Sequence, residues 1–427
     1  MPEENPTNPQ QSTSKAINWK LIGIIAVIAA IVIGGLGYAA VVLDFFGTKV
    51  QETPQTTKQA SPSAKAKQKE KAVKIFWTTD YEIWLKEENK NSRKVVTETK
   101  KILDWEVLQD GKIAYITAEK VEDENEYDDA DEYYGTKIII FDLSTNKKET
   151  LLSIPLKTIL AGEKSNVACR TEDPDISTLA ISPDNKILAY ARSGLWLINL
   201  GSKNTKQVLK TAALQQPVSK NTELVAPCIV YQDLRWVEGN LIEIETGRWE
   251  WGEIALVNDK GKVFHKYNSS FGLTKQLTYS NQPLFLLVID LPGEPQESDG
   301  SKIGVAEVDK EQGLNFKSVL YSTKDYIYDI EIIGNTIYFI EQKFRDLETN
   351  SYKLKTFNLT TKKTTTLQDL GTNNVRCFKL LGGNLYYEQS SKAKEMKIYK
   401  FDPKTSKQIL IDTIQGNISG CVRFEKF

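Results

Sequence analysis

Histidine is almost absent from this chain: His265 is the only one among 427 residues. Because histidine is the most frequent general base and metal ligand in enzymes, its scarcity argues against most catalytic mechanisms. His265 lies in KVFHKY, where it alternates with Phe264 on a predicted outer strand and faces solvent. The sequence also lacks a nucleophile elbow, a phosphate-binding glycine loop and a paired-cysteine zinc motif. We therefore predict no catalysis, no cofactor and no metal, although two carboxylates alone would suffice for a glycoside hydrolase.

Cysteine and net charge are low as well. Four cysteines are too few for a scaffold built on disulfides. The 55 basic and 56 acidic side chains leave a net charge of −1, and the lysines concentrate in one polar segment instead of a patch with aromatic residues. Nucleic acid is therefore not expected as a partner.

One long uncharged run is present, at residues 21–43 (LIGIIAVIAAIVIGGLGYAAVVL). A helix of this length reaches about 34 Å, enough to cross the hydrocarbon core of a membrane. A cleaved signal peptide is the alternative, but its apolar region would be shorter, and no cysteine follows the run for a lipoprotein attachment. Lys20 before the run and Asp44 after it favour a cytoplasmic tail at residues 1–20 and place the rest of the chain outside the cytoplasm.

The predicted transmembrane helix continues into a flexible segment. Residues 44–73 are rich in Lys, Pro, Ser and Thr and nearly free of apolar side chains, which predicts a flexible tether. Within the helix, Ala26, Ala30 and Gly34 recur on one face, where a second copy could pack to form a homodimer. The sequence therefore predicts a single-pass protein of the cell membrane.

Residues 74–427 show the alternation of apolar and polar side chains that is typical of β-strands, and no helical period. Short runs rich in Ile, Tyr and Phe are bounded by Gly, Asn, Asp and Pro, as in KIAYITAE (112–119), KIIIFDL (137–143) and IYFIE (337–341). Many short strands at regular spacing predict an all-β sandwich, barrel or propeller.

A repeated unit favours the propeller. Each unit has an apolar strand, a tight polar turn, a second apolar strand, a third strand that ends in Asp or Asn, and a polar fourth strand. Tight turns are predicted at 110–111, 184–185, 239–240, 281–282, 334–335 and 383–384. The complete units span residues 102–155, 176–211, 231–268, 272–323, 325–370 and 375–413.

The remaining strands, three in 74–98 and one in 417–425, would complete a seventh unit. Their pairing closes the ring and leaves no exposed sheet edge. The sequence therefore predicts a seven-bladed β-propeller over residues 74–427, with six or eight blades as the alternatives, behind a single N-terminal transmembrane helix.

Residues 182–190 (SPDNKILAY), followed by the strand 195–200 (LWLINL), resemble the repeat of the TolB-type, WD-repeat-like bacterial β-propellers. In that family a Ser-Pro-Asp-Gly turn precedes an apolar strand that ends in Tyr, and Asn185 here replaces the glycine. The other units match in degenerate form, and TolB itself has a cleaved signal and an added amino-terminal domain where this chain has the predicted anchor and tether. The resemblance implies a propeller that binds through a face or its central channel, but no particular partner.

The four cysteines lie at comparable places in neighbouring units. Cys169 and Cys228 each precede a first strand, and Cys377 and Cys421 each lie within one. Inner strands of adjacent blades run close together, so disulfides 169–228 and 377–421 are feasible outside the cytoplasm, and the second would lock the ring. Four free buried thiols and the other pairings stay open as alternatives.

Two surface features are candidate contact sites. The insertion 119–132 (EKVEDENEYDDADE) carries nine acidic residues and predicts a solvated loop or an acidic docking surface, with calcium binding as the alternative. In TGRWEWGE, Arg248, Trp249 and Trp251 lie beside a tight turn, where the tryptophans would either stack on a sugar or a partner ring, or pack between blades. The candidate contacts in the insertion are Asp123, Asp128, Asp129 and Asp131.

Together these patterns predict a membrane-anchored, extracytoplasmic propeller that binds a protein partner or acts as a cell-envelope scaffold without catalysis. The competing hypothesis is a glycan-binding receptor or a carboxylate-dependent glycoside hydrolase that uses the mouth of the central channel.

Overall fold

The structure is a computed structural model, and the chain divides into two units, Met1–Lys67 and Gln68–Phe427. The predicted membrane helix 21–43, with Ala26, Ala30 and Gly34, and the tether up to residue 71 lie outside the described residues. Within the described part of the chain, no helix has the length and apolar character needed to cross a membrane. The described residues are 72–87, 89–121, 132–164, 175–210, 230–236, 241–248, 251–269, 276–279, 284–290, 300–309, 313–343, 351–390, 395–416 and 418–426.

The described strands form seven antiparallel sheets of four strands each. The first sheet, in the order β28-β1-β2-β3, combines the last strand of the chain with the first three. Its strands are β1 (Val73–Thr78), β2 (Glu82–Glu87), β3 (Arg93–Thr97) and β28 (Ser419–Lys426). The second sheet contains β4 (Lys101–Val107), β5 (Lys112–Val121), β6 (Glu132–Asp142) and β7 (Lys147–Ser153). The third contains β8 (Leu179–Ile181), β9 (Ile187–Ala191), β10 (Gly194–Asn199) and β11 (Thr205–Lys210).

The other four sheets follow in chain order, each built from consecutive strands. The fourth contains β12 (Val230–Trp236), β13 (Leu241–Arg248), β14 (Trp251–Asn258) and β15 (Val263–Ser269). The fifth contains β16 (Gln276–Tyr279), β17 (Leu284–Asp290), β18 (Ser301–Asp309) and β19 (Gly313–Thr323). The sixth contains β20 (Tyr326–Ile333), β21 (Thr336–Lys343), β22 (Ser351–Asn358) and β23 (Thr364–Gly371), and the seventh β24 (Asn374–Leu381), β25 (Asn384–Ser390), β26 (Glu395–Asp402) and β27 (Lys407–Gln415).

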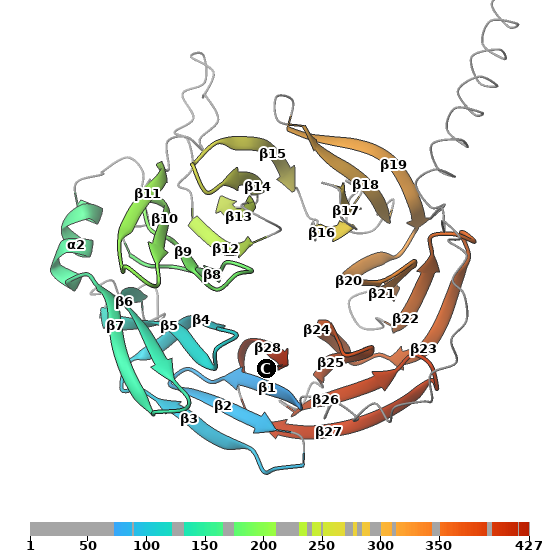
Figure 1. The fold of residues 1–427 in the computed structure, drawn as a ribbon, viewed down its shortest axis with the longest axis horizontal. Helices are drawn as coiled ribbons and strands as arrows, with labels where there is room; N and C mark the ends of the chain where they lie inside the picture. Colours follow the sequence, from blue (N-terminus) through green and yellow to red (C-terminus); the bar gives the residue numbers. More distant parts are fainter. Residues whose placement is uncertain are drawn as a thin grey trace, which may run out of the picture. The chain divides into compact units, whose positions relative to one another are not determined.

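The sheets follow one another around a common centre, with the first strand of each sheet innermost, except in the first sheet, where β28 takes that place (Figure 1). This arrangement is propeller-like, and the sheets occupy the residue ranges in which the sequence predicts repeats. Apolar clusters fill the space between neighbouring sheets: one, for example, joins Phe76 and Ile83 of the first sheet to Trp105 and Ile113 of the second. Burying one such aliphatic side chain stabilises the fold by about 1.5–3 kcal/mol, so the contacts between sheets hold the ring together.

The tight turns between the first and second strands use the backbone conformation that the sequence predicts. Gly111, Asn185, Gly334 and Gly383 all have positive φ, between 52° and 81°. The predicted turns at 239–240 and 281–282 lie outside the described residues. The repeated Asp or Asn at the end of the third strand has a structural role as well, because its side chain accepts hydrogen bonds from the next turn. Asn358 Oδ1, for instance, accepts them from the backbone N–H groups of Thr360 and Thr361 at 3.0 and 2.8 Å.

The two ends of the described chain meet in the first sheet. β1 pairs antiparallel with β28, and Val73 lies opposite Lys426 in the register. A disulfide joins Cys421 of β28 to Cys377 of β24 in the neighbouring sheet. Cys377 has a positive φ of 57° at an irregularity in the β24–β25 pairing. The last strand is therefore fastened to both the first and the seventh sheet.

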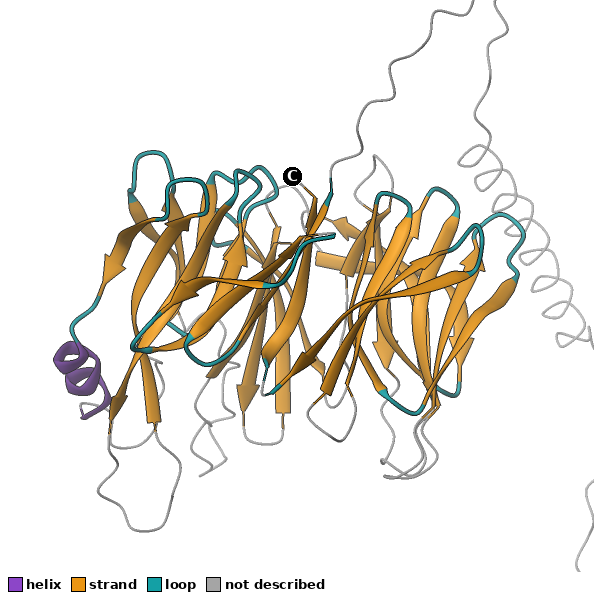
Figure 2. Ribbon diagram, turned by 90° about the horizontal axis from the view of Figure 1, so that it is seen from below, coloured by secondary structure: helices purple, strands orange, loops and turns teal. Residues whose placement is uncertain are grey.

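Among the described residues after 72, one helix interrupts the β-structure and corrects the prediction that residues 74–427 contain no helical period. The helix α2 spans Leu156–Lys164, between β7 and β8, and lies outside the ring of sheets (Figure 2). Its buried Ile159 and partly buried Leu156 and Leu160 pack on the cluster between the second and third sheets. The signal is hard to recognise in sequence because Leu156, Ile159 and Leu160 make only a short helical stripe within nine residues.

Candidate functional site

Charged side chains of three inner strands gather around the centre of the ring. β4, β12 and β28 belong to three different sheets, and Figure 1 shows them close to the common centre. All three carry charged residues at alternate positions, which places those side chains on one side of each strand. The residues are Asp104 and Glu106 of β4, Asp233 and Arg235 of β12, and Arg423 and Glu425 of β28.

Arg423 is the cation at the middle of this carboxylate cluster. Its Nη1 lies 3.0 Å from Glu106 Oε1, and its Nη2 lies 3.8 Å from Asp104 Oδ1. The guanidinium carbon also lies 5.1 Å from the ring centroid of Trp105, a favourable cation–π distance. The side chains of Arg423 and Glu106 are 32% and 16% exposed, so they are largely enclosed but still reachable by solvent.

Asp104 is held in place by donors from the next sheet. Its Oδ2 accepts hydrogen bonds from Thr178 Oγ1 at 2.9 Å and from the backbone N–H of Leu179 at 2.7 Å. Its Oδ1 accepts a third from the backbone N–H of Trp105, also at 2.7 Å. Asp104 therefore ties β4 to the start of β8 and gives Arg423 a fixed negative partner.

The strand that carries Arg423 is held at the two preceding residues, Val422 and Cys421. The backbone N–H of Val422 donates to Glu388 Oε2 at 3.3 Å, and Glu388 is fully buried beside Arg376, whose Nε lies 2.9 Å from it. The disulfide of Cys421 holds the preceding residue. The strand that carries the cation is thus fixed by a buried carboxylate and a covalent bond.

The cluster shifts the pKa values of its carboxyl groups upward. Burial raises the pKa of Glu106 to about 7, and the nearby Asp104 and Asp233 carboxylates add to the effect, while Arg423 opposes it. Burial likewise raises the pKa of Asp233 to about 6, followed by repulsion from Asp104. Asp233 is an exposed residue, so it is the protein groups that surround its carboxyl group, and not full burial, that raise its pKa. Near neutral pH the Glu106 carboxyl group is therefore partly protonated.

The pair of carboxyl groups, Glu106 and Asp233, is suited to proton transfer. A carboxyl group with a pKa near 7 can donate a proton to a leaving group, and an ionised partner can accept one from water. Burial would lower the pKa of Arg423, but the carboxylates of Glu106 and Asp104 outweigh it and raise that pKa, so the guanidinium stays charged. Among the residues that the structure describes, no group of three or more His, Cys, Asp or Glu is placed to hold a metal ion.

The structure places few of the candidate contact residues that the sequence singles out. Asp123, Asp128, Asp129 and Asp131, together with Trp249, Cys169 and Cys228, lie outside the described residues. Arg248 and Trp251 lie opposite each other in the register where the β13–β14 hairpin ends. His265 lies on β15, the fourth strand of its sheet. The protein partner, the membrane and the homodimer stay predictions.

Sequence reasoning missed the carboxylate cluster, although a signal for it was present. Charged residues alternate with apolar ones in ILDWEV (102–107), DLRW (233–236) and VRFEK (422–426), each in the innermost strand of a sheet. The side of a strand that carries charged residues usually faces solvent. In a propeller the first strands surround one axis, so three charged sides instead face a common centre.

Comparisons with known proteins support the fold. No protein-family model matches the chain, and no curated protein matches it in sequence. A protein of Bacteroides fragilis assigned as a 6-phosphogluconolactonase is similar in structure, with a TM-score of 0.50 and 11% identity over 84% of this chain and 99% of that chain. The periplasmic gluconolactonase of Pseudomonas aeruginosa gives a TM-score of 0.50 and 9% identity over 83% of this chain and 98% of its own. TolB from Acinetobacter baumannii gives a TM-score of 0.34 and 13% identity over 69% and 63% of the two chains.

The two likenesses with a TM-score of 0.50 support a β-propeller fold and nothing finer. The chain covers half the length, 50%, of a prolyl endopeptidase that it also resembles. The prediction that the chain is not an enzyme is contradicted, because most of the similar structures are enzymes, namely peptidases and gluconolactonases. The scarcity of histidine excludes only mechanisms that need histidine, and the central carboxylates offer another route.

Proposed function

We propose that the seven sheets are the blades of a propeller whose centre catalyses hydrolysis with carboxyl groups. One observation carries the proposal: Glu106 and Asp233, from different sheets, interact electrostatically and have pKa values of about 7 and 6, with Arg423 acting on both. A protonated and an ionised carboxyl group beside a permanent cation are what acid–base hydrolysis requires near neutral pH.

The two carboxyl groups take different roles because their pKa values differ. Asp233, with the lower pKa, accepts a proton from a water molecule, whose oxygen then attacks the substrate. Glu106, with the higher pKa, donates its proton to the leaving oxygen as that bond breaks. Arg423 stabilises the negative charge that develops between them. A proton passed from Asp233 to Glu106 through solvent restores the starting state.

A hydroxyl-rich substrate, such as a glycan or a sugar lactone, suits this site. Carboxylates and a guanidinium bind hydroxyl groups through hydrogen bonds and require no bound metal or histidine. The gluconolactonases among the similar structures make sugar lactones a natural first class to test, although their likeness to this chain extends to the fold alone.

Hydrolysis of a panel of glycosides and sugar lactones by the purified full-length protein tests this proposal. Glu106→Gln and Asp233→Asn should each reduce kcat by at least about a hundredfold, the usual contribution of a general acid or base. Glu149→Gln, an exposed carboxylate on the outer strand β7, is the matched control and should keep the wild-type rate. The wild-type rate should follow a bell-shaped pH profile with limbs near 6 and 7. Full activity in both variants would refute the assigned roles.

We also propose that residues 21–43 anchor the chain in the cell membrane and that the propeller lies outside the cytoplasm. The uncharged run and the charges that flank it support this topology. Membranes washed with alkaline carbonate should retain the full chain and release a chain that begins at residue 68. Release of both would contradict the anchor.

A further inference from the structure

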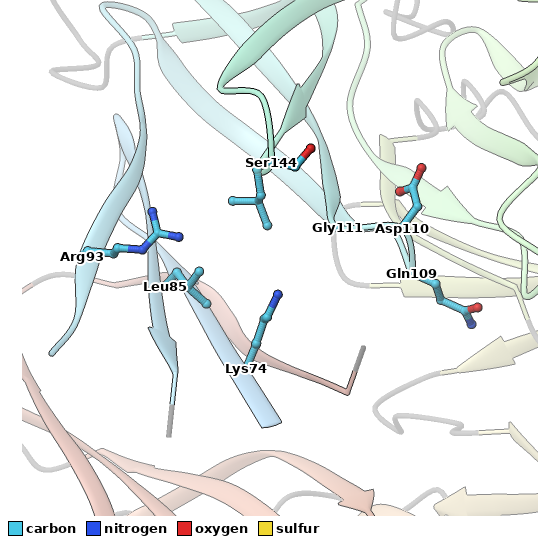
Figure 3. Close-up of a pocket in the computed structure, with 8 residues that line it drawn as sticks. Lys74, Leu85, Arg93, Gln109, Asp110, Gly111 and Ser144 are labelled. Atoms are coloured by element: carbon cyan, nitrogen blue, oxygen red, sulfur yellow. The ribbon is translucent and has the colours of Figure 1, made fainter. Parts of the chain in front are cut away.

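The strand connections lie on two opposite sides of the ring, and these two sides differ in charge. On one side, counting outward from the innermost strand, the first strand of a sheet turns into the second and the third into the fourth. The described chain also begins and ends on this side, and Figure 2 shows the C-terminus beside the short turns. Figure 3 shows Gln109 and Ser144 in two of these turns, which are joined by a hydrogen bond of 3.2 Å from the backbone N–H of Leu143 to the carbonyl oxygen of Gly111. We refer to this side as the turn face.

The described residues of the turn face carry more basic than acidic side chains. The count covers the turns, one strand residue on either side of each turn, and the two terminal strand residues at each end of the described chain. It gives fourteen basic and eight acidic side chains, with Lys74 and Glu425 both included. Both members of each ion pair formed between these residues are included, so pairing among them does not remove the excess of six positive charges. Exposed basic side chains on the turn face include Lys90, Lys203, Lys260, Lys362, Lys363 and Lys404.

This excess does not depend on where the count stops. Counting one residue further into each strand increases it. The positions between these strands that the structure does not describe add three acidic residues and one basic residue, at 88, 238, 310 and 311, and an excess of four positive charges is left. The turn face therefore carries net positive charge in a chain whose net charge is −1.

The connections on the opposite side show no such excess. They join the second strand of each sheet to the third, and the fourth to the innermost strand of the next sheet. The same count over their described residues, with helix α2 included, gives nine basic and nine acidic side chains. The undescribed positions of these connections contain sixteen acidic and six basic residues in the sequence, seven of the acidic ones in 122–131. The acidic residues of the connections are thus concentrated opposite the turn face.

Two further features of the turn face match the surface of a lipid bilayer. Ile333, beside the β20–β21 turn, is 40% exposed, and Ile409, two residues after Lys407, is 45% exposed. Basic side chains attract anionic headgroups, and exposed apolar side chains among them can insert between the headgroups. The chain also enters the turn face from a basic segment, because residues 65–71 (KAKQKEK) lie shortly before β1.

We propose that the turn face rests on the anionic headgroups of the membrane. Each lysine near such a surface adds to the attraction, and the acidic residues of the opposite connections are repelled from it. A flexible segment of about 30 residues, such as the predicted tether, spans about 30 Å on average, so the turn face can reach the headgroups. This inference does not depend on the proposed hydrolase, but it rests on the proposed anchor at residues 21–43, which brings the turn face to a membrane.

Lysine footprinting of the full-length protein in lipid nanodiscs tests the orientation. Nanodiscs of phosphatidylcholine, with or without phosphatidylglycerol, are treated with N-acetoxysuccinimide at low conversion, and acetylation is measured by peptide mass spectrometry. With phosphatidylglycerol present, acetylation of Lys203 and Lys363 should fall at least about threefold, whereas Lys210 and Lys324 on the opposite side should react as they do without it. Strands of seven or eight residues separate the two sides by about 25 Å, more than the Debye length of about 10 Å at 0.1 M salt. At about 1 M salt the shielding should disappear.

Charge reversal decides whether the turn face itself is responsible. Lys260→Glu with Lys404→Glu, on two exposed turns, should remove most of the shielding at the other lysines of the turn face. The matched control, Lys210→Glu with Lys324→Glu, makes the same change of charge on the opposite side and should keep the shielding. Equal losses in the two variants would overturn the proposal, and so would equal shielding on both sides or in phosphatidylcholine alone. A chain that does not enter nanodiscs would contradict the anchor and this inference together, whereas a chain that enters without shielding would contradict this inference alone.

Discussion

Replacing Glu106 with glutamine should change how the stability of the protein depends on pH. Burial holds the pKa of Glu106 at about 7 in the folded protein, against an ordinary value of 4.5. The folded state therefore binds this proton more tightly than the unfolded state, and the free energy of unfolding falls as pH rises from 4.5 towards 7. At about 1.4 kcal/mol per pH unit, this carboxyl group makes the folded protein about 3 kcal/mol less stable above that range than below it.

Glutamine resembles the protonated carboxyl group and cannot ionise, so Glu106→Gln removes this loss. Urea unfolding of residues 68–427, followed by the fluorescence of the tryptophans, measures the effect. At about pH 5 the variant and the wild type should have similar free energies of unfolding, and at about pH 8 the variant should be more stable by up to about 3 kcal/mol. Glu149→Gln should run parallel to the wild type, because Glu149 is exposed on β7. If Glu106→Gln also runs parallel to the wild type at both pH values, Glu106 does not have a raised pKa and cannot be the proposed acid.

Three further substitutions test the fold around the site, each by urea unfolding. Cys421→Ser removes a disulfide between residues 44 positions apart and should lower the free energy of unfolding by up to about 4 kcal/mol. A urea midpoint equal to that of the oxidised wild type would show that the disulfide does not stabilise the ring. Asp104→Ala leaves the donors on Thr178 and Leu179 without their acceptor and should lower the free energy of unfolding by about 1–3 kcal/mol. Asp104→Asn should lower it less. Equal losses would mean that these hydrogen bonds do not stabilise the fold. Ile113→Ala, at a fully buried position, should lower the free energy of unfolding by about 2–5 kcal/mol. Leu410→Ala, at 50% exposure, should change it by no more than about 0.5 kcal/mol. Similar effects of the two substitutions would contradict the assigned core.

Local chemistry made the sheets and their turns predictable from the sequence. Gly111 and Asn185 adopt positive φ because a tight hairpin demands it, and both residue types tolerate that conformation. The repeated Asp or Asn after each third strand marks a turn that its own side chain stabilises, as Asn358 shows. The leftover strands at the two ends could be paired because an unpaired sheet edge is unfavourable, and β28 does lie beside β1.

The central site was not predictable in the same way, because it depends on how distant strands converge. Glu106 and Asp233 belong to repeats separated by a whole intervening sheet, and no spacing along the chain relates them. Their raised pKa values come from enclosure by protein groups and from repulsion by neighbouring carboxylates, Asp104 above all, which the local sequence does not encode. The lack of histidine was misleading for the same reason, since enclosure gives ordinary carboxyl groups the pKa values usually supplied by histidine.

The pairing of β1 with β28 has a consequence for the order in which this protein is made and folded. During synthesis from the amino terminus, β1, β2 and β3 emerge first, yet one edge of their sheet has no partner until the last residues of the chain appear. The unpaired edge belongs to β1 (VKIFWT), whose side chains are almost all buried in the folded protein. Contacts between residues far apart in the chain form slowly, so the first sheet is completed last. Until β28 is made, the unpaired edge of β1 is exposed and can pair with another chain.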